Sequence, residues 1–159
     1  MTSKNILKKS EDAAHAPMDL GALEHNVGYY MRKSVLAAQS SFLRETGVKL
    51  MTGQYSVMEI IANNPGRTQS AIAWAAGLDR SSLVPILNQF EKNGFIRKEP
   101  VQNDKRAYAV SLTAEGEKEL AELRVKVEEM EQVFIKGMGA RNHKQLISLL
   151  GKFLETLKD

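Results

Sequence analysis

The chain has 159 residues, of which 43% are hydrophobic and 26% charged, a composition typical of one ordinary globular domain that buries its own core. Its formal net charge of +3 is compatible with a polyanionic partner but is too small to demonstrate one. The absence of cysteine excludes disulfides, thiolate catalysis and zinc fingers, and it fits the reducing cytoplasm, where we expect the protein to reside.

Residues 1–18 have the composition of a flexible arm. Lys4, Lys8 and Lys9 are followed by two acidic residues, and the segment contains no long apolar run. We therefore expect neither a signal peptide nor a membrane span here, and no membrane partner. Simple disorder and a basic arm that touches DNA or a partner subunit are both compatible with this composition.

Two helices are predicted after the arm. Apolar residues recur in steps of three and four from Leu20 to Phe42, which predicts a long helix that Asp19 caps. A short helix is predicted after Thr52, its candidate cap, and the turn residues 63–66 end it. Its inward-facing residues are Tyr55, Met58, Ile61 and Ala62.

Two further short helices are separated by a very tight turn. The first covers residues 68–76 and is closed by Gly77, which suits the left-handed position after a helix. Asp79 can cap the second, which ends at 93–94, and such a pair forms a helix-turn-helix. Pro85 removes an interior hydrogen bond, so the second helix either begins later or bends, and the register of its contacts stays open.

A hairpin and two more helices complete the chain. Residues 95–99 and 106–112 alternate as two strands around a polar, basic tip, which predicts a wing. Thr113 can cap a helix with a heptad stripe, interrupted by Gly137 and Gly139, and Asn142 with Gln145 can start the last helix as a capping box. The predicted fold is mainly α with a small β-hairpin wing: a winged helix-turn-helix (52–113) flanked by helical regions 19–51 and 114–159, within a single domain (19–159).

Two motifs in this order resemble the multiple-antibiotic-resistance regulator (MarR) family. Leu78-Asp79-Arg80-Ser81-Ser82-Leu83, with the exit Phe90-Glu91-Lys92-Asn93-Gly94-Phe95-Ile96, is similar to the family's recognition helix. Asp104-Lys105-Arg106, then Leu112-Thr113 and Gly116, resembles its wing signature. The resemblance extends from Leu20 to the C-terminus. It implies a homodimer that the first and last helices build, and a small-molecule effector, often a phenolic or other aromatic carboxylate.

The candidate partner of the helix-turn-helix is double-stranded DNA, expected as a palindromic operator. Side chains near the start of a recognition helix read base edges, while hydroxyls and backbone N–H groups hold phosphates. Our candidates on the helices are Gln69, Ser70, Arg80, Ser81, Ser82, Asn88 and Gln89, and those on the wing are Lys98, Asp104, Lys105 and Arg106. Arg106 can enter a minor groove with Asp104 holding its guanidinium; a hairpin salt bridge without DNA contact is the alternative.

Other features admit more than one interpretation. His25, Tyr29 and Arg32 are spaced by four and three on one side of the first predicted helix, and such a face can bind an aromatic acid, although a solvated face or a dimer contact fits the spacing too. Trp74 lies off the expected core position, and we predict that it packs against the first helix or the wing, with a place in the lining of a pocket as the alternative. The amphipathic terminal helices pack either within the subunit or, as the resemblance implies, in a dimer.

The function we expect is that of a sequence-specific transcriptional regulator, a homodimeric repressor that a small-molecule effector releases from its operator. An enzyme is disfavoured because the three histidines are far apart and no catalytic constellation or glycine-rich phosphate loop is present. No metal-ligand spacing is recognisable, and neither a cofactor nor a metal is expected. A ligand-insensitive architectural DNA-binding protein, or a protein-interaction winged helix, remains the alternative.

Overall fold

The fold is that of a computed structural model, which describes residues 18–46, 53–101 and 104–157, without the side chains of residues 45–46 and 104–107. The chain divides into two compact units, Met1–Ser40 and Ser41–Asp159, and the division falls inside a helix. Within the described ranges, no helix is long and apolar enough to cross a membrane. Of the predicted arm (1–18) only Met18 is described, and Thr52, the predicted cap of the short helix, lies outside the described residues.

The first unit contains a short 3-10 helix, η1 (Gly21–His25), and the beginning of α2 (Val27–Thr46). Asp19 Oδ1 accepts a hydrogen bond from Gly21 N at 2.8 Å, but the N-cap position of η1 is held by Leu20, which makes no side-chain cap hydrogen bond. Asn26 adopts an extended conformation, and its Oδ1 accepts a hydrogen bond from Tyr29 N at 2.7 Å. The predicted helix start at Asp19 is therefore wrong, because Asn26 interrupts the helix and caps the second part.

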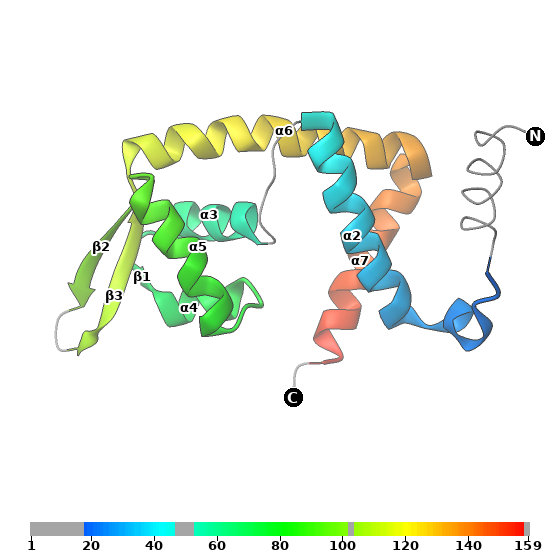
Figure 1. The fold of residues 1–159 in the computed structure, drawn as a ribbon, viewed down its shortest axis with the longest axis horizontal. Coiled ribbons are helices and arrows are strands. Elements are labelled where there is room, and N and C mark those ends of the chain that lie inside the picture. Colours follow the sequence, from blue (N-terminus) through cyan, green and yellow to red (C-terminus); the bar gives the residue numbers. More distant parts are fainter. Residues whose placement is uncertain (1–17, 47–52, 102–103, 158–159) are drawn as a thin grey trace, which may run out of the picture. The chain divides into compact units, whose positions relative to one another are not determined.

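The second unit is a winged helix-turn-helix with two further helices. Its elements are α3 (Gln54–Asn63), β1 (Arg67–Thr68), α4 (Gln69–Ala75), α5 (Arg80–Lys92), β2 (Ile96–Val101), β3 (Asp104–Leu112), α6 (Ala114–Met138) and α7 (Ala140–Glu155) (Figure 1). The antiparallel sheet has the order β1-β3-β2. The predicted fold class is confirmed, and β1, which pairs Arg67 with Val110, is an addition to it.

Three helices begin at side-chain caps, and the sequence predicts two of these caps, Asp79 and Thr113, whereas Thr68 was expected as the first residue of its helix. The side chains of Thr68, Asp79 and Thr113 accept hydrogen bonds from the backbone N–H groups of Ala71, Ser82 and Gly116. The helix that Asp79 caps runs unbroken from Arg80 to Lys92 with Pro85 inside it, so the later start that we considered is wrong. At α3 the cap position is held by Gly53 rather than by Thr52.

The predicted capping box at the start of α7 is also wrong. The helix begins at Ala140, directly after Gly139, whose φ of 84° is accessible to glycine at little cost. Asn142 lies in the first turn, where its Nδ2 donates to Met138 O at 2.8 Å. Asn142 therefore ties the start of α7 to the end of α6 instead of capping the helix.

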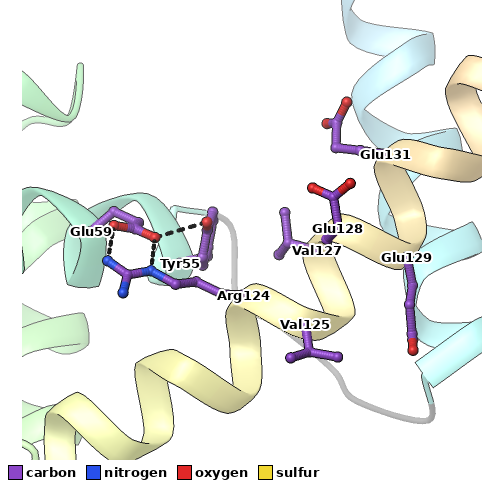
Figure 2. A pocket seen from close by; sticks show the side chains of 8 residues that line it. All are labelled: Tyr55, Glu59, Arg124, Val125, Val127, Glu128, Glu129 and Glu131. Atoms are coloured by element: carbon purple, nitrogen blue, oxygen red, sulfur yellow. Dashed lines mark hydrogen bonds and ion pairs between the residues drawn. The ribbon is translucent and has the colours of Figure 1, made fainter.

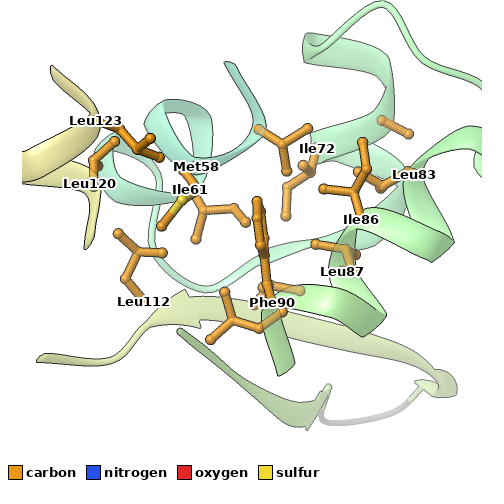
Figure 3. Close-up of a cluster of buried hydrophobic side chains, with 14 residues drawn as sticks. Met58, Ile61, Ile72, Leu83, Ile86, Leu87, Phe90, Leu112, Leu120 and Leu123 are labelled. Atoms are coloured by element: carbon orange, nitrogen blue, oxygen red, sulfur yellow. The ribbon is translucent and has the colours of Figure 1, made fainter. Parts of the chain in front are cut away.

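The core of the second unit lies between the sheet and the helices α3, α4, α5 and α6. Figure 3 shows Phe90 of α5 among Met58 and Ile61 of α3, Ile72 of α4 and Leu112 of β3. Leu120 and Leu123 of α6 belong to the same cluster. Because α6 contributes to this core, the first half of α6 is fixed to the helix-turn-helix.

Thr113 and Gly116 fix the junction between the wing and α6. Thr113 Oγ1 donates to Gly94 O at 2.6 Å, and Thr113 N donates to Phe95 O at 3.0 Å. A Cβ on Gly116 would lie only 2.0 Å from Phe95 O, so the helix approaches this backbone closer than any other residue type permits. The Leu-Thr and Gly positions of the wing signature thus have a packing role.

The exposure of the Trp74 side chain contradicts the predicted packing against the wing. Its relative exposure is 83%, whereas its neighbours Ile72 and Ala73 on α4 are buried. The side chain points away from the core because the buried face of α4 is formed by residues three and four apart, on the opposite side of the helix. Within the described part of the second unit, no side chain buries this tryptophan, and the predicted packing against the first helix, most of which belongs to the other unit, is not tested.

Candidate nucleic-acid interface and neighbouring cleft

The start of α5 is organised by one carboxylate. Asp79 Oδ1 accepts hydrogen bonds from Ser82 N at 2.8 Å and from Ser81 Oγ at 2.5 Å, and Oδ2 accepts from Ser82 Oγ at 3.0 Å. These hydrogen bonds, with that from Ser81 first, lower the pKa of Asp79 from 3.8 to about 2. Because both hydroxyls donate to the carboxylate, their oxygen lone pairs remain as acceptors toward a ligand.

The exposed side of α5 carries the remaining candidates on this helix. Arg80, Ser81 and Ser82 are exposed at its start, and Asn88 and Gln89 are exposed two turns further along. Seven-residue spacing aligns Ser81 with Asn88 and Ser82 with Gln89 along the helix. Gln89 Nε2 donates to Asn93 Oδ1 at 3.1 Å, which orients this amide in the structure.

Gln69 and Ser70 open α4. Ser70 is exposed, and Gln69 is half-buried at the first helical position, after the cap Thr68. From residue 69 to residue 92 the sequence has two carboxylates, Asp79, whose oxygens accept the hydrogen bonds at the helix start, and Glu91, which pairs with Lys98. The two helices of the helix-turn-helix therefore present a surface with little charge to repel a polyanion.

The wing contains both structural and candidate binding residues. Lys98 Nζ lies 2.7 Å from Glu91 Oε2, and the lysine side chain is only 14% exposed, so this pair ties β2 to α5. Arg97 pairs with Glu99 at 3.0 Å. Backbone pairing places Asp104 at the beginning of β3, whereas the side chains of Asp104, Lys105 and Arg106 are outside the described part, so the predicted contact between Asp104 and Arg106 is not tested.

The three candidate effector residues do not share one helix. His25 belongs to η1, and the extended Asn26 separates it from Tyr29 and Arg32 on α2, so the four-residue spacing from His25 does not place it on their face. Lys33 Nζ donates to Tyr29 Oη at 3.3 Å and lies 5.5 Å from the centre of the Tyr29 ring. This lysine adds a cation to the aromatic surface of α2, which the sequence analysis did not include.

A cleft of about 690 Å³ lies between α3 and α6 (Figure 2). Its lining consists of Tyr55, Glu59, Arg124, Val125, Val127, Glu128, Glu129 and Glu131. Four of these eight residues are glutamates and one is a cation, so the cleft has a negative lining. A carboxylate ligand would be repelled by this lining.

An ion pair at the cleft joins α3 to α6. Arg124 Nε and Nη2 lie 2.6 and 2.8 Å from the two carboxylate oxygens of Glu59, in a bidentate arrangement. Tyr55 Oη also donates to Glu59 Oε1 at 2.9 Å. The hydrogen bond from Arg124 is the main reason that the pKa of Glu59 falls from 4.5 to about 2. The sequence analysis missed this pair, because residues 65 positions apart give no local signal.

Comparisons with known proteins were made for the whole chain. A family model described as the MarR family matches residues 50–108. A putative transcriptional regulatory protein for the hcr operon of Thauera aromatica is 34% identical over 132 residues, which are 82% of this chain and 80% of the relative.

Solved structures extend the similarity to most of the fold. The transcriptional repressor CouR bound to a 23-mer DNA duplex has a TM-score of 0.78 and 28% identity, over 87% of this chain and 99% of CouR. CouR bound to p-coumaroyl-CoA has a TM-score of 0.77 and 26% identity, over 87% of this chain and 98% of CouR.

Proposed function

The chain belongs to the MarR family and is a DNA-binding transcriptional regulator, not an enzyme, and we propose that it acts as a homodimeric repressor that an anionic aromatic compound releases from a palindromic operator. The main support is the pairing of a capped, weakly charged helix-turn-helix with a terminal helix, α7, of which no residue is buried. The weakly charged helix-turn-helix is suited to binding DNA, and the exposed helix α7 is suited to packing against a second copy of the chain.

DNA recognition is proposed to use α5 in the major groove. The side chains near the start of the helix, Arg80, Ser81 and Ser82, reach base edges, and Asn88 and Gln89 extend the same surface. Arg80 suits guanine, while the two serines, whose protons are held by Asp79, accept from exocyclic amino groups. Gln69 and Ser70 at the start of α4 contact phosphates.

The wing is proposed to contact the neighbouring minor groove through Arg106, with Asp104 as its positioning carboxylate. Lys105 adds attraction to phosphate that does not depend on sequence. The contact of Lys98 with Glu91 gives this lysine a structural role in holding the wing against α5. We therefore assign Lys98 a smaller part in DNA binding than Arg106.

Dimerisation is proposed to bury the apolar surface of α7 together with that of α6. Leu146, Ile147, Leu150 and Leu154 of α7 are 43%, 58%, 39% and 61% exposed. Val125 and Val133 of α6 are exposed as well. So much apolar surface on adjacent helices is unusual for a monomer, and a two-fold interface would remove it from water.

The effector is proposed to be an aromatic carboxylate, or a larger anionic conjugate of one, that contacts Tyr29 and Arg32, with His25 at the adjoining end of η1. The cations Arg32 and Lys33 and the ring of Tyr29 provide charge pairing and stacking for such a compound. The relative CouR binds p-coumaroyl-CoA, an aromatic conjugate of this kind. The acidic lining of the α3–α6 cleft makes that cleft unsuitable for the anionic group.

The effector proposal is tested by fluorescence anisotropy on labelled DNA from beside the protein's own gene, titrated with aromatic carboxylates, p-coumaroyl-CoA and coenzyme A alone. We expect an aromatic anion to weaken DNA binding at least tenfold, which requires about 1.4 kcal/mol of coupling. By linkage, DNA must weaken binding of that compound by the same factor. If no aromatic anion changes the affinity for DNA, the effector part of the proposal fails.

The substitution Arg32→Ala tests whether the effector binds at Arg32. It should weaken binding of the active compound about tenfold, the effect of one charge-assisted pair, and change DNA binding without the compound by less than about threefold. Arg44→Ala is the matched control, because it removes the same charge from the other end of α2. Undiminished affinity of Arg32→Ala for the compound would exclude Arg32 from the site.

A further inference from the structure

Trp74 is the single tryptophan of the chain and is among its most exposed large hydrophobic residues, at 83%. Folding gains little from this side chain, since the core cluster uses Ile72 and Ala73 on the opposite side of α4. Tryptophan that is exposed in a free protein is enriched at binding surfaces, because the indole combines a large apolar body with one N–H donor.

The surroundings of Trp74 leave the indole projecting from the surface. Helical spacing places Ser70, four residues earlier, on the same side of α4. Ala71 and Ala75 flank this side and are both exposed, so no bulky neighbour shields the ring. The helix has no charged residue at all. A negatively charged surface can therefore approach Trp74 without meeting a carboxylate of α4.

Trp74 is also next to the beginning of α5. Gly77 N donates to Trp74 O at 3.1 Å and Leu78 N donates to Ala73 O at 2.9 Å, which fold the two-residue turn against the end of α4. Asp79 and Arg80 follow directly, so the end of α4 and the start of α5 lie together (Figure 1). The surface around Trp74 is thus continuous with the end of α5 that is proposed to enter the major groove.

We infer that Trp74 lies against the DNA backbone beside the groove that α5 enters, with Nε1–H donating to a phosphate oxygen and the ring packed on a deoxyribose. The inference rests on the proposed DNA contacts of α4 and α5. Phosphate and sugar receive half or more of protein–DNA hydrogen bonds, and such contacts position the protein without reading sequence. The contact is therefore made on any duplex that the protein binds.

Intrinsic fluorescence tests the contact directly, since Trp74 is the single tryptophan. Acrylamide quenching of the full-length protein is measured alone and saturated with an unrelated 23-bp duplex at low salt, with saturation followed separately by anisotropy of labelled DNA. We expect DNA to reduce the quenching constant at least twofold. N-acetyltryptophanamide with the same duplex controls for absorption by DNA.

Each other outcome has a definite meaning. Saturation by anisotropy with an unchanged quenching constant overturns the inference and leaves the proposed function intact. Weak quenching already in the free protein also overturns it, because a second copy or another part of the chain would then cover Trp74. Absence of DNA binding by anisotropy under these conditions overturns the inference together with the proposed function.

Variants of Trp74 supply a second readout. Trp74→Ala should weaken binding to operator and to unrelated duplex by the same factor, about fivefold to tenfold, and Trp74→Phe, which keeps an aromatic ring, should weaken it less. The dependence of affinity on salt should not change, because a neutral indole releases no counterion. Arg80→Ala is the comparison, with a larger loss on operator than on unrelated DNA. Full affinity of Trp74→Ala on both duplexes would contradict the contact.

Discussion

Asp79 combines a structural and a functional task at the start of α5. Its carboxylate satisfies the N–H of Ser82 and receives the protons of both serine hydroxyls. The pKa of about 2 means that Asp79 is ionised at every physiological pH, so this arrangement does not change with pH in the cell. In the proposed complex, Ser81 and Ser82 would therefore meet DNA as acceptors, which suits amino groups on bases better than phosphate oxygens.

Substitution of Ser82 distinguishes these two kinds of contact. Ser82→Ala should weaken binding to the operator by about 1 kcal/mol and binding to unrelated DNA by much less, because a base contact exists only where the right base is present. Ser70→Ala is the control, with equal losses on both DNAs expected for a phosphate contact. Anisotropy titrations at one salt concentration measure both. Equal losses for Ser82→Ala would make Ser82 a phosphate contact.

The lowered pKa of Glu59 predicts how the free energy of unfolding depends on pH. This pKa falls from 4.5 to about 2 on folding, so the folded chain takes up the proton only at lower pH than the unfolded chain does. The stabilisation is therefore complete above pH 4.5 and is lost as pH falls toward 2. We expect Glu59→Gln to lower the free energy of unfolding by about 1 kcal/mol at pH 7, a value discounted for the exposure of Arg124, and by progressively less below pH 4.5.

Urea unfolding of the parent and Glu59→Gln between pH 2.5 and 7 measures this difference. Glu129→Gln is the matched control, since it removes a negative charge from the same cleft without removing a partner of Arg124. A difference between parent and Glu59→Gln that stays constant across the whole range would show that the ion pair with Arg124 does not contribute to stability.

At the scale of elements, the contact between α6 and the wing depends on Gly116. A Cβ at this position would lie 2.0 Å from Phe95 O. The substitution Gly116→Ala must therefore displace either α6 or the backbone at Phe95, directly before β2. We expect a loss of about 1–3 kcal/mol in the free energy of unfolding, measured by urea denaturation. Gly137→Ala, in the same helix with open space around the added carbon, should cause no loss. Similar stability for the two variants would contradict this packing.

Two cations of the wing, Arg106 and Lys98, are expected to have different roles. Arg106→Ala should weaken DNA binding by about 1–3 kcal/mol and reduce its salt dependence, because a contact in the phosphate-lined groove is lost. Lys98→Ala should have a smaller effect on DNA binding and instead lower thermal stability, since Lys98 holds Glu91. Anisotropy at several salt concentrations and thermal unfolding separate the two effects. If Arg106→Ala retains both affinity and salt slope, Arg106 has only a structural role.

Local signals explain which elements the sequence predicts. Asp79 and Thr113 are caps within three residues of the groups they bind, and the sequence predicts both of these helix starts correctly, whereas Thr68 was expected inside its helix rather than as its cap. The start of α2 was wrong because apolar spacing continues through η1, and only the backbone of Asn26 reveals the interruption. At α7, Gly139 starts the helix without any side-chain cap, and the capping-box pattern was therefore misleading.

Features that depend on distant residues were beyond sequence reasoning. The strand β1 has two residues, and it exists because β3 supplies a partner more than forty positions away. The pair Glu59 and Arg124 is more distant still, 65 positions apart in the chain. Local spacing placed Trp74 off the core side of its helix, but it did not reveal that the wing leaves this side chain exposed. Five candidates were identified because they lie near predicted helix starts: Gln69, Ser70, Arg80, Ser81 and Ser82.

For the whole molecule, charge and apolar surface are divided between two regions. Residues 52–113 contain seven Lys or Arg and five Asp or Glu, whereas residues 114–159 contain eight and nine. The positive excess therefore lies on the winged helix-turn-helix, and the exposed apolar residues of α7 lie on the less basic part. This division supports one region that meets DNA and another that meets a second copy of the chain.

Selection of DNA from a random pool by the full-length protein tests the central proposal, a dimer that reads a specific sequence. A two-fold dimer with α5 in the major groove must enrich an inverted repeat, with half-site centres about 10 bp apart or a multiple of this, one helical turn per step. We predict such a repeat, and a complex with two chains per duplex by analytical ultracentrifugation. Enrichment of a single unrepeated site, or of no sequence at all, would contradict the account.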